Sequence, residues 1–344
     1  AVALHRRQQF ETTIRRSESR QRVRLSCDAE GRMTGVGHEA WVSNLPAETF
    51  SEPVSQATPF TYEGENRKIG HHVGRLNITC AGSMRAPGEA IGVPVTEAAM
   101  DELAHAAGID PVEFRLRNIP EKDPSSGRPF SSHRLADCLR RGAESFGWHN
   151  RQAPGARREG EWLIGMGVTS AIRVNMLEPS TARVILLPDG TARVETDMTD
   201  IGTGSYSILT QIAAEVLGLP ADRLTTVLGD SDLPQSSGSG GSFGAASSGS
   251  SVMLAAKAVR QKLAKRMECD PDELTLKDGY AIAENRRRTL AEVLAGDTLQ
   301  GTGTIKKGLT SLGHQQASWG AQFAEVAVSS VTGEVHVRRL AATF

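Results

Sequence analysis

The strongest constraint on the fold is a pattern of strand-like and helix-like segments that starts again in the second half of the chain. Residues 22–38 alternate apolar and polar side chains around a Gly-containing turn, which predicts a β-hairpin. A helical spacing of apolar residues follows over residues 89–107. After the Arg-, Gly- and Pro-rich stretch of residues 150–161, read as a linker, strand-like segments return. This order predicts an α/β (α+β) fold with two related mixed sheet-plus-helix domains, 1–150 and 151–344.

The other segments fit the same division. Irregular sequence is expected from the first hairpin to about Gly82, and Asp110-Pro111 predicts the start of a short helix that ends near Arg117. The second half is expected to contain strands, helices, a Ser/Gly stretch that leads into a helix, and hairpins. The strands are placed at 162–170, 182–187, 192–196, 321–328 and 335–341, and the helices at 206–217 and up to 266. The Ser/Gly stretch is 236–251, and the hairpin turns lie near Gly279 and at Thr332-Gly333.

Composition excludes several classes of protein. The chain has 344 residues, with 39% hydrophobic and 23% charged side chains, as in a globular protein. No apolar run approaches the ~18 residues of a membrane span. The net charge of −1 gives no reason to expect nucleic acid as a partner. The four cysteines are widely separated, which excludes the usual zinc and iron–sulfur spacings and favours reduced, buried or semi-buried thiols.

Two glycine-rich stretches are candidates for ligand binding. Ile201-Gly202-Thr203-Gly204 follows Asp200 between a predicted strand and a predicted helix. Such a turn is either an anion site made of backbone N–H groups or only a tight turn. Gly240-Gly241-Ser242-Phe243-Gly244-Ala245 runs straight into a predicted helix. It is read as a structured loop able to bring N–H and hydroxyl donors to a phosphate, with a flexible linker as the alternative.

A third candidate is the turn before the helix of residues 89–107. Arg85 lies in Met84-Arg85-Ala86-Pro87-Gly88 and offers a planar set of donors for a carboxylate or an oxyanion. The alternative is a surface arginine that bonds a neighbouring loop. Other candidates are weaker: His71-His72 lacks ligands at metal spacing, and Glu97 and Asp101 are expected to face solvent.

Taken together, these motifs resemble the large subunit of molybdenum hydroxylases, the xanthine dehydrogenase/aldehyde oxidase family. The turn of residues 84–90, the Gly108–Asn118 segment with its Asp110-Pro111 and the two glycine-rich stretches occur in the family's order and spacing. Within the family the chain is most similar to the bacterial aldehyde oxidoreductase type. The resemblance implies two related molybdenum-cofactor-binding domains, with molybdopterin cytosine dinucleotide as the cofactor.

The resemblance also implies roles for single residues. Arg85 would orient the substrate and stabilise developing negative charge, and Ala86 would place a backbone N–H near the metal's oxygen ligands. Ile201, Gly202, Thr203 and Gly204 would contact the pterin, although relatives often have Gln in place of Thr203. Gly240, Gly241, Ser242, Phe243, Gly244 and Ala245 would surround the pyrophosphate and pterin. Ile172 or Arg173 would contact the substrate, and Arg173 suits an aldehyde better than a purine.

Two motifs of the family are not in this sequence. The resemblance implies a Gly- and Phe-containing loop before Ala1 and, after Phe344, a Gly-X-Gly-Glu motif whose Glu is the general base. We therefore expect an internal part of a longer subunit that is inactive by itself.

The resemblance finally implies an enzyme and its partners. The expected reaction oxidises an aldehyde to a carboxylic acid with water as the oxygen donor, while iron–sulfur clusters and FAD on partner subunits carry the electrons away. The alternatives are hydroxylation of an N-heterocycle of the xanthine type and a non-catalytic phosphate- or dinucleotide-binding module. The expected compartment is the cytoplasm, with periplasmic export alongside a partner subunit as the alternative.

Overall fold

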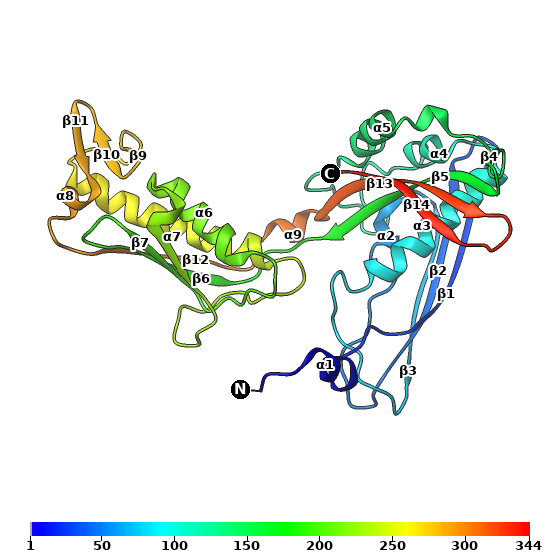
Figure 1. Cartoon of the computed structure of the whole chain (residues 1–344), viewed down its shortest axis with the longest axis horizontal. Coiled ribbons are helices and arrows are strands. Elements are labelled where there is room, and N and C mark those ends of the chain that lie inside the picture. The colour runs from blue at the N-terminus through cyan, green and yellow to red at the C-terminus, as the bar shows by residue number, and fades with distance from the viewer. Residues whose placement is uncertain (1) are drawn as a thin grey trace. The chain divides into compact units, whose positions relative to one another are not determined.

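The computed structural model describes residues 2–344 and divides the chain into two compact units. The first unit contains the chain up to Val174 together with Thr310–Phe344, and the second is Asn175–Leu309 (Figure 1). Helices and strands alternate in both units, which confirms the mixed α/β class. Among the described residues, no helix has the length and apolar composition that crossing a membrane requires.

One three-stranded sheet of the first unit follows the order β1-β2-β3. β1 (Ser19–Cys27) and β2 (Met33–Asn44) form the predicted antiparallel hairpin. β3 (Asn66–Arg75) pairs with β2 in parallel, so the expectation of irregular sequence up to Gly82 was wrong. α3 (Glu89–Ala106) contacts β1 and ends one residue before the predicted end. This sheet and α3 lie on either side of the 84–88 turn in the sequence.

A four-stranded antiparallel sheet of the first unit joins distant parts of the chain in the order β14-β13-β5-β4. β5 (Trp162–Val174) pairs with β13 (Ala317–Ser329) along its whole length, and the two strands lie side by side in Figure 1. β14 (Val335–Thr343) completes the C-terminal hairpin. β4 (Arg157–Glu159) pairs with β5, so the stretch read as a linker is partly a strand.

This pairing explains why the compact units follow a different division from the expected domains 1–150 and 151–344. β13 buries apolar side chains under α5 (Leu135–Phe146), where Leu139 and Phe323 are fully buried, whereas Val337 and Leu340 of β14 are exposed. The C-terminal segment therefore packs with the first half of the chain. The division at about residue 150 stays a prediction about domains.

The second unit is a four-stranded sheet, in the order β12-β6-β7-β8, with two helices packed on it. α6 (Ser205–Leu217) and α7 (Gly244–Arg266) share a core with the sheet that includes the fully buried Leu217 and Val259. The strands are β6 (Ser180–Leu186), β7 (Ala192–Glu195), β8 (Leu224–Val227) and β12 (Leu299–Ile305). The Ser/Gly stretch of residues 236–251 is thus a loop up to Phe243, and its residues from Gly244 onward belong to α7.

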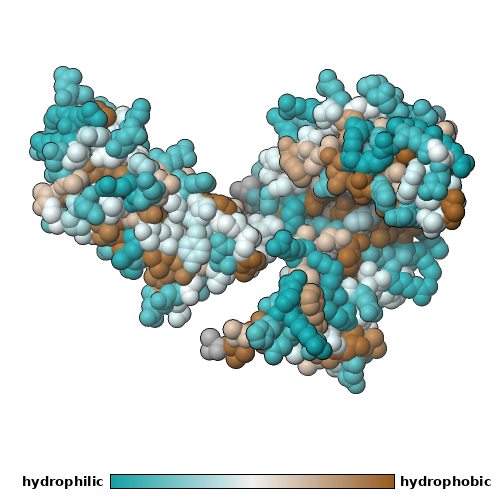
Figure 2. Space-filling view, viewed as in Figure 1, coloured by the Kyte–Doolittle hydropathy of each residue, from teal (hydrophilic) through white to brown (hydrophobic). Residues whose placement is uncertain are grey.

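Short elements complete both units. In the second unit, a small sheet contains the hairpin predicted near Gly279. In the view of Figure 2, hydrophilic residues cover much of the visible face of each unit. The short elements are α1 (Arg6–Thr12), α2 (Thr58–Thr61), α4 (Pro111–Arg117), η1 (Trp148–Asn150), η2 (Ala221–Arg223), β9 (Thr275–Lys277), β10 (Tyr280–Ala283), β11 (Arg286–Thr289), α8 (Leu290–Leu294) and α9 (Thr310–Gly313).

Candidate functional site

The candidate residues lie in both units. Arg85, Ala86, Ile172 and Arg173 belong to the first unit, and both glycine-rich loops belong to the second. The structure brings candidates together within each unit.

The turn that carries Arg85 has a constrained backbone. The Arg85 side chain is exposed, and Ala86 adopts a positive φ of 51°, which is uncommon for a residue with a Cβ. Gly88 has φ 85° and lies so close to Pro53 that a Cβ would be 2.2 Å from the Pro53 carbonyl oxygen. The turn can therefore take this path only with glycine at position 88.

An ion pair connects the end of this turn to β5. Glu89, the first residue of α3, has a side chain that is only 4% exposed. One guanidinium nitrogen of Arg173 lies 2.8 Å and 2.7 Å from its two carboxylate oxygens. The structure thus places the predicted substrate residue Arg173 beside the Arg85 turn, with its charge balanced by a buried carboxylate.

Ile172 points the other way, as strand alternation requires. Its side chain is 7% exposed and lines a cavity of about 10 Å³, together with Glu97 and Val54 among others. A cavity of that size holds about one water molecule. Contact of Ile172 or Arg173 with a substrate stays a prediction.

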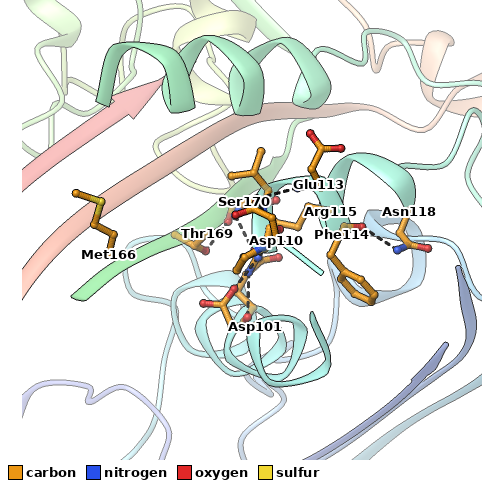
Figure 3. Close-up of polar contacts among 12 residues, drawn as sticks. Asp101, Asp110, Glu113, Phe114, Arg115, Asn118, Met166, Thr169 and Ser170 are labelled. Atoms are coloured by element: carbon orange, nitrogen blue, oxygen red, sulfur yellow. Dashed lines mark hydrogen bonds and ion pairs between the residues drawn. The ribbon is translucent and has the colours of Figure 1, made fainter. Parts of the chain in front are cut away.

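A buried polar network holds α3, α4 and β5 together (Figure 3). The fully buried Arg115 of α4 donates from Nε to Glu97, at 2.8 Å, and from a terminal nitrogen to Asp101, at 2.6 Å. The backbone N–H of Ser170 donates to Glu97 at 2.7 Å. Glu97 is 3% exposed, so the expectation that it faces solvent was wrong. Glu97 lies on the side of α3 that faces Arg115. Nothing in the sequence around either residue indicated that the two are partners.

Tyr62 completes the network. Its hydroxyl donates to Glu97 at 2.7 Å and lies 2.7 Å from the Ser170 hydroxyl. Burial raises the pKa of Tyr62 well above its usual value, and the Glu97 carboxylate raises it further. Burial alone would lower the pKa of Arg115, but the Glu97 carboxylate outweighs it and raises this pKa. Tyr62 therefore stays protonated and Arg115 stays charged, which suits a scaffold rather than proton transfer.

The Asp110-Pro111 motif is also structural. The Asp110 carboxylate accepts from the backbone N–H groups of Val112 and Glu113, as the sequence predicts for a helix cap. It also accepts from the Trp148 indole at 3.0 Å. The Asp110-Pro111 motif, which carries much of the resemblance, therefore fixes the start of α4. This helix follows the Arg85 turn in the sequence.

In the second unit, the first glycine-rich loop surrounds a carboxylate of its own. Asp200 Oδ1 accepts from the backbone N–H groups of Gly202, Thr203 and Gly204 at 2.8, 2.9 and 3.3 Å, and Oδ2 accepts from Tyr206 at 3.4 Å. Burial would raise the pKa of Asp200, but these four N–H groups outweigh it and lower the pKa. The loop is thus an anion site whose anion, in this structure, is Asp200.

The second glycine-rich loop lies against the segment before the first. The backbone N–H of Ser236 donates to Asp197 at 2.5 Å, and the Ser239 hydroxyl donates to the Thr199 carbonyl. Gly241 and Ser242 both have positive φ, 49° and 59°. The stretch is therefore a structured loop, as expected, and the two loops are neighbours.

The residues at the start of α7 fit an anionic ligand. α7 has 23 residues, and no described side chain caps its N-terminus. The first N–H groups of a helix have no partner within the helix, and the helix dipole favours negative charge there. These free donors beside a tight glycine loop suit the phosphates of a dinucleotide. Among the described residues, no group of three or more His, Cys, Asp or Glu side chains could hold a metal ion.

Comparison with known families gives the decisive observation. Residues 1–119 and residues 141–344 each match a family described as the molybdopterin cofactor-binding domain. The chain belongs to this family. The resemblance found in the sequence is thereby confirmed, including the presence of two molybdenum-cofactor-binding domains.

Curated relatives agree. The aldehyde oxidoreductase molybdenum-binding subunit PaoC of Escherichia coli (strain K12) is 46% identical over 332 residues, which cover 96% of this chain and 45% of the relative. The putative xanthine dehydrogenase molybdenum-binding subunit XdhA of the same strain is 34% identical over 159 residues, 44% of this chain and 21% of the relative. The chain therefore spans about half the length of the relative that it matches along most of its own length.

Solved structures share the fold. Quinoline 2-oxidoreductase from Pseudomonas putida 86 matches with a TM-score of 0.80 at 20% identity, over 96% of this chain and 47% of that chain. Aldehyde oxidoreductase from Desulfovibrio gigas matches with a TM-score of 0.79 at 21% identity, over 97% of this chain and 38% of that chain.

Proposed function

We propose that the full-length protein is the large subunit of a molybdenum hydroxylase that oxidises an aldehyde to a carboxylic acid, with water as the oxygen donor. The observation that carries the proposal is the 46% identity, along 96% of this chain, to a subunit named for aldehyde oxidation. The aldehyde-oxidising relative is thus matched along almost the whole chain, whereas the xanthine dehydrogenase relative XdhA is matched along 44% of it.

The cofactor would be molybdopterin cytosine dinucleotide, which supplies two-electron oxidation when bound. The free N–H groups at the start of α7 and the loop Gly240–Ala245 would hold its phosphates, because they combine helix-end donors with close backbone approach. Ile201, Gly202, Thr203 and Gly204 would contact the pterin. The N–H groups of Gly202, Thr203 and Gly204 are bonded to Asp200, so contact would come from the outward face of the loop or follow a movement of Asp200.

On the substrate side, the exposed Arg85 guanidinium would orient the aldehyde and donate to the oxygen that gains negative charge. Ala86 would direct its backbone N–H toward the cofactor. Arg173 would border the substrate pocket as one half of an ion pair with Glu89, and so would add polar surface with little net charge.

Proton removal requires a base outside the described chain. Glu97 is paired with Arg115 and accepts from Tyr62, and Glu325 is paired with Arg339 and two other arginines, so both carboxylates have structural partners. We propose that a glutamate beyond Phe344 is the general base and that the segment alone is inactive. Iron–sulfur and FAD subunits would accept the electrons, in the cytoplasm or, as an alternative, after export with a partner to the periplasm.

A second candidate is oxidation of an N-heterocycle, which the identity to XdhA favours. Turnover of the full-length protein with its partner subunits separates the two. We expect isotope-labelled oxygen from water in the acid formed from an aldehyde, and a higher kcat/KM for aldehydes than for hypoxanthine. Turnover of hypoxanthine alone, or of neither compound, would contradict the aldehyde proposal.

A further inference from the structure

The backbone of the Arg85 turn is held by an arginine from far away in the sequence. The guanidinium of Arg16 donates to the carbonyl oxygen of Arg85, at 2.7 Å, and to that of Met84. Arg16 is brought there by its neighbour Arg15, whose backbone N–H bonds Cys80 and whose carbonyl accepts from Gly82, at 3.0 and 3.1 Å. The first part of the chain is thus attached directly before the turn.

The other side of the Arg16 guanidinium contacts a buried carboxylate. Arg16 lies 2.7 Å from Oε1 of Glu52, which is 0% exposed. The same oxygen accepts from the backbone N–H of Gly88 at 2.7 Å. The Gln56 amide adds a bond to the Pro87 carbonyl at 2.8 Å. Both ends of the 84–88 turn are therefore tied to one ion pair.

Glu52 is not explained by stability alone. Its Oε2 is buried and has no hydrogen-bond partner among the described residues. A buried carboxylate with an unsatisfied oxygen is costly, and replacement by an apolar side chain is often neutral or stabilising. What the carboxylate supplies here is an acceptor for Gly88 and a fixed partner for Arg16.

We propose that Arg16 and Glu52 are positioning residues that hold the 84–88 turn, and with it the Arg85 side chain and the Ala86 backbone, in the arrangement the reaction needs. The proposal rests on the function proposed above. Neither residue touches the substrate, because Arg16 contacts the back of the turn through carbonyl oxygens. A lysine could not replace Arg16, because only the planar guanidinium reaches the carboxylate and two carbonyls at once.

The expected effect is large because Arg85 would act on developing charge. The Arg85 side chain is exposed, so its direction depends on the backbone of the turn, and a misplacement of about 1 Å can cost on the order of a hundredfold in rate. Substrate affinity depends less on that direction. Loss of the Arg16–Glu52 pair should therefore lower kcat more than it raises KM.

The test uses the full-length protein loaded with cofactor and bound to its partner subunits. Arg16→Met removes the ion pair, and Arg16→Lys keeps the positive charge with fewer contacts. Glu52→Gln neutralises the carboxylate. Glu325→Gln is the matched control, because Glu325 is equally buried and paired with arginines but makes no contact with the turn. Three quantities are measured: amide hydrogen exchange of residues 84–88, kcat and KM for an aldehyde, and molybdenum content.

We expect Arg16→Met and Glu52→Gln to speed exchange in the turn and to lower kcat by about tenfold or more, with KM and molybdenum content nearly unchanged. Arg16→Lys should lie between them and the wild type, and Glu325→Gln should change neither exchange nor kcat. If Glu52→Gln does not fold, the two Arg16 variants decide.

Unchanged exchange in the turn, or faster exchange with unchanged kcat, would overturn the proposal. A wild-type protein that oxidises no aldehyde would instead remove the proposed function. In that case the exchange measurement still reports whether Arg16 holds the turn, so the two failures can be distinguished.

Discussion

Asp200 shows how one side chain can occupy a site that its neighbours create. The glycine-rich turn predicts free backbone donors, and the structure has them, but they point at the carboxylate of the residue that begins the loop. An Asp at this position is an ordinary cap for such a turn, so the sequence does not distinguish a filled site from an open one. The charge of Asp200 should therefore stabilise the loop.

This predicts a pH dependence of stability. The pKa of folded Asp200 is lowered, so its contribution is fully present above the unfolded value of about 3.9 and is lost as pH falls through the folded value. In urea unfolding, Asp200→Asn should be less stable than the wild type at neutral pH, and the difference should shrink toward about pH 3. A difference that is the same at both pH values would show that the carboxylate charge plays no part.

Glu97 and Arg16 have buried or long-range contacts that the sequence does not predict. Helical spacing placed Glu97 one turn from Asp101 and suggested a solvated face, whereas Arg115 from the next helix buries it. The sequence does not indicate that Arg16 contacts Met84 and Arg85, because 68 residues separate Arg16 from Met84. The Arg85 turn has a recognisable local pattern, and the role of Arg85 stays a prediction.

At the scale of elements, local patterns predicted what local interactions decide. α3, α4 and α6 have apolar spacing and end signals of their own, and all three predicted hairpins turn at glycine. β3 was missed because its sequence, NRKIGHHVGR, is polar and its parallel partner is far away. β4 is three charged residues that form a strand only beside β5. Such strands depend on tertiary pairing, which periodicity does not report.

The contact between β12 and α7 is an element-scale feature that can be tested. A Cβ on Gly303 would lie 2.1 Å from the carbonyl oxygen of Ser251, so β12 approaches the helix backbone only because this residue is glycine. Within a strand, alanine is normally more favourable than glycine. Here, however, the added Cβ would force the helix to move, as in an overpacked core.

We expect Gly303→Ala to lower the free energy of unfolding by about 1–3 kcal/mol. Gly167→Ala is the control, because position 167 in β5 has no other atom within 4 Å of the added Cβ and does not have positive φ. Denaturant unfolding of both variants gives the comparison. Equal stability of Gly303→Ala and Gly167→Ala would contradict the close packing of β12 on α7.

At the scale of the molecule, the candidate residues come from both compact units, and the relative PaoC is about twice as long as the chain. The turn with Arg85 and the ion pair of Glu89 with Arg173 belong to the first unit. The glycine-rich loops before α6 and α7 belong to the second unit, and the start of α7 has backbone donors that suit phosphates. The residues and loops of the two units thus support cofactor binding. The catalytic base is proposed to lie outside this chain, in the rest of the full-length protein.

The central claim is that this chain binds a molybdopterin dinucleotide. Its most direct test is the metal and nucleotide content of the full-length protein, purified with its partner subunits. We expect close to one molybdenum per large subunit and a matching amount of cytidine monophosphate after acid hydrolysis. A folded protein that contains neither molybdenum nor cytidine nucleotide would contradict the account.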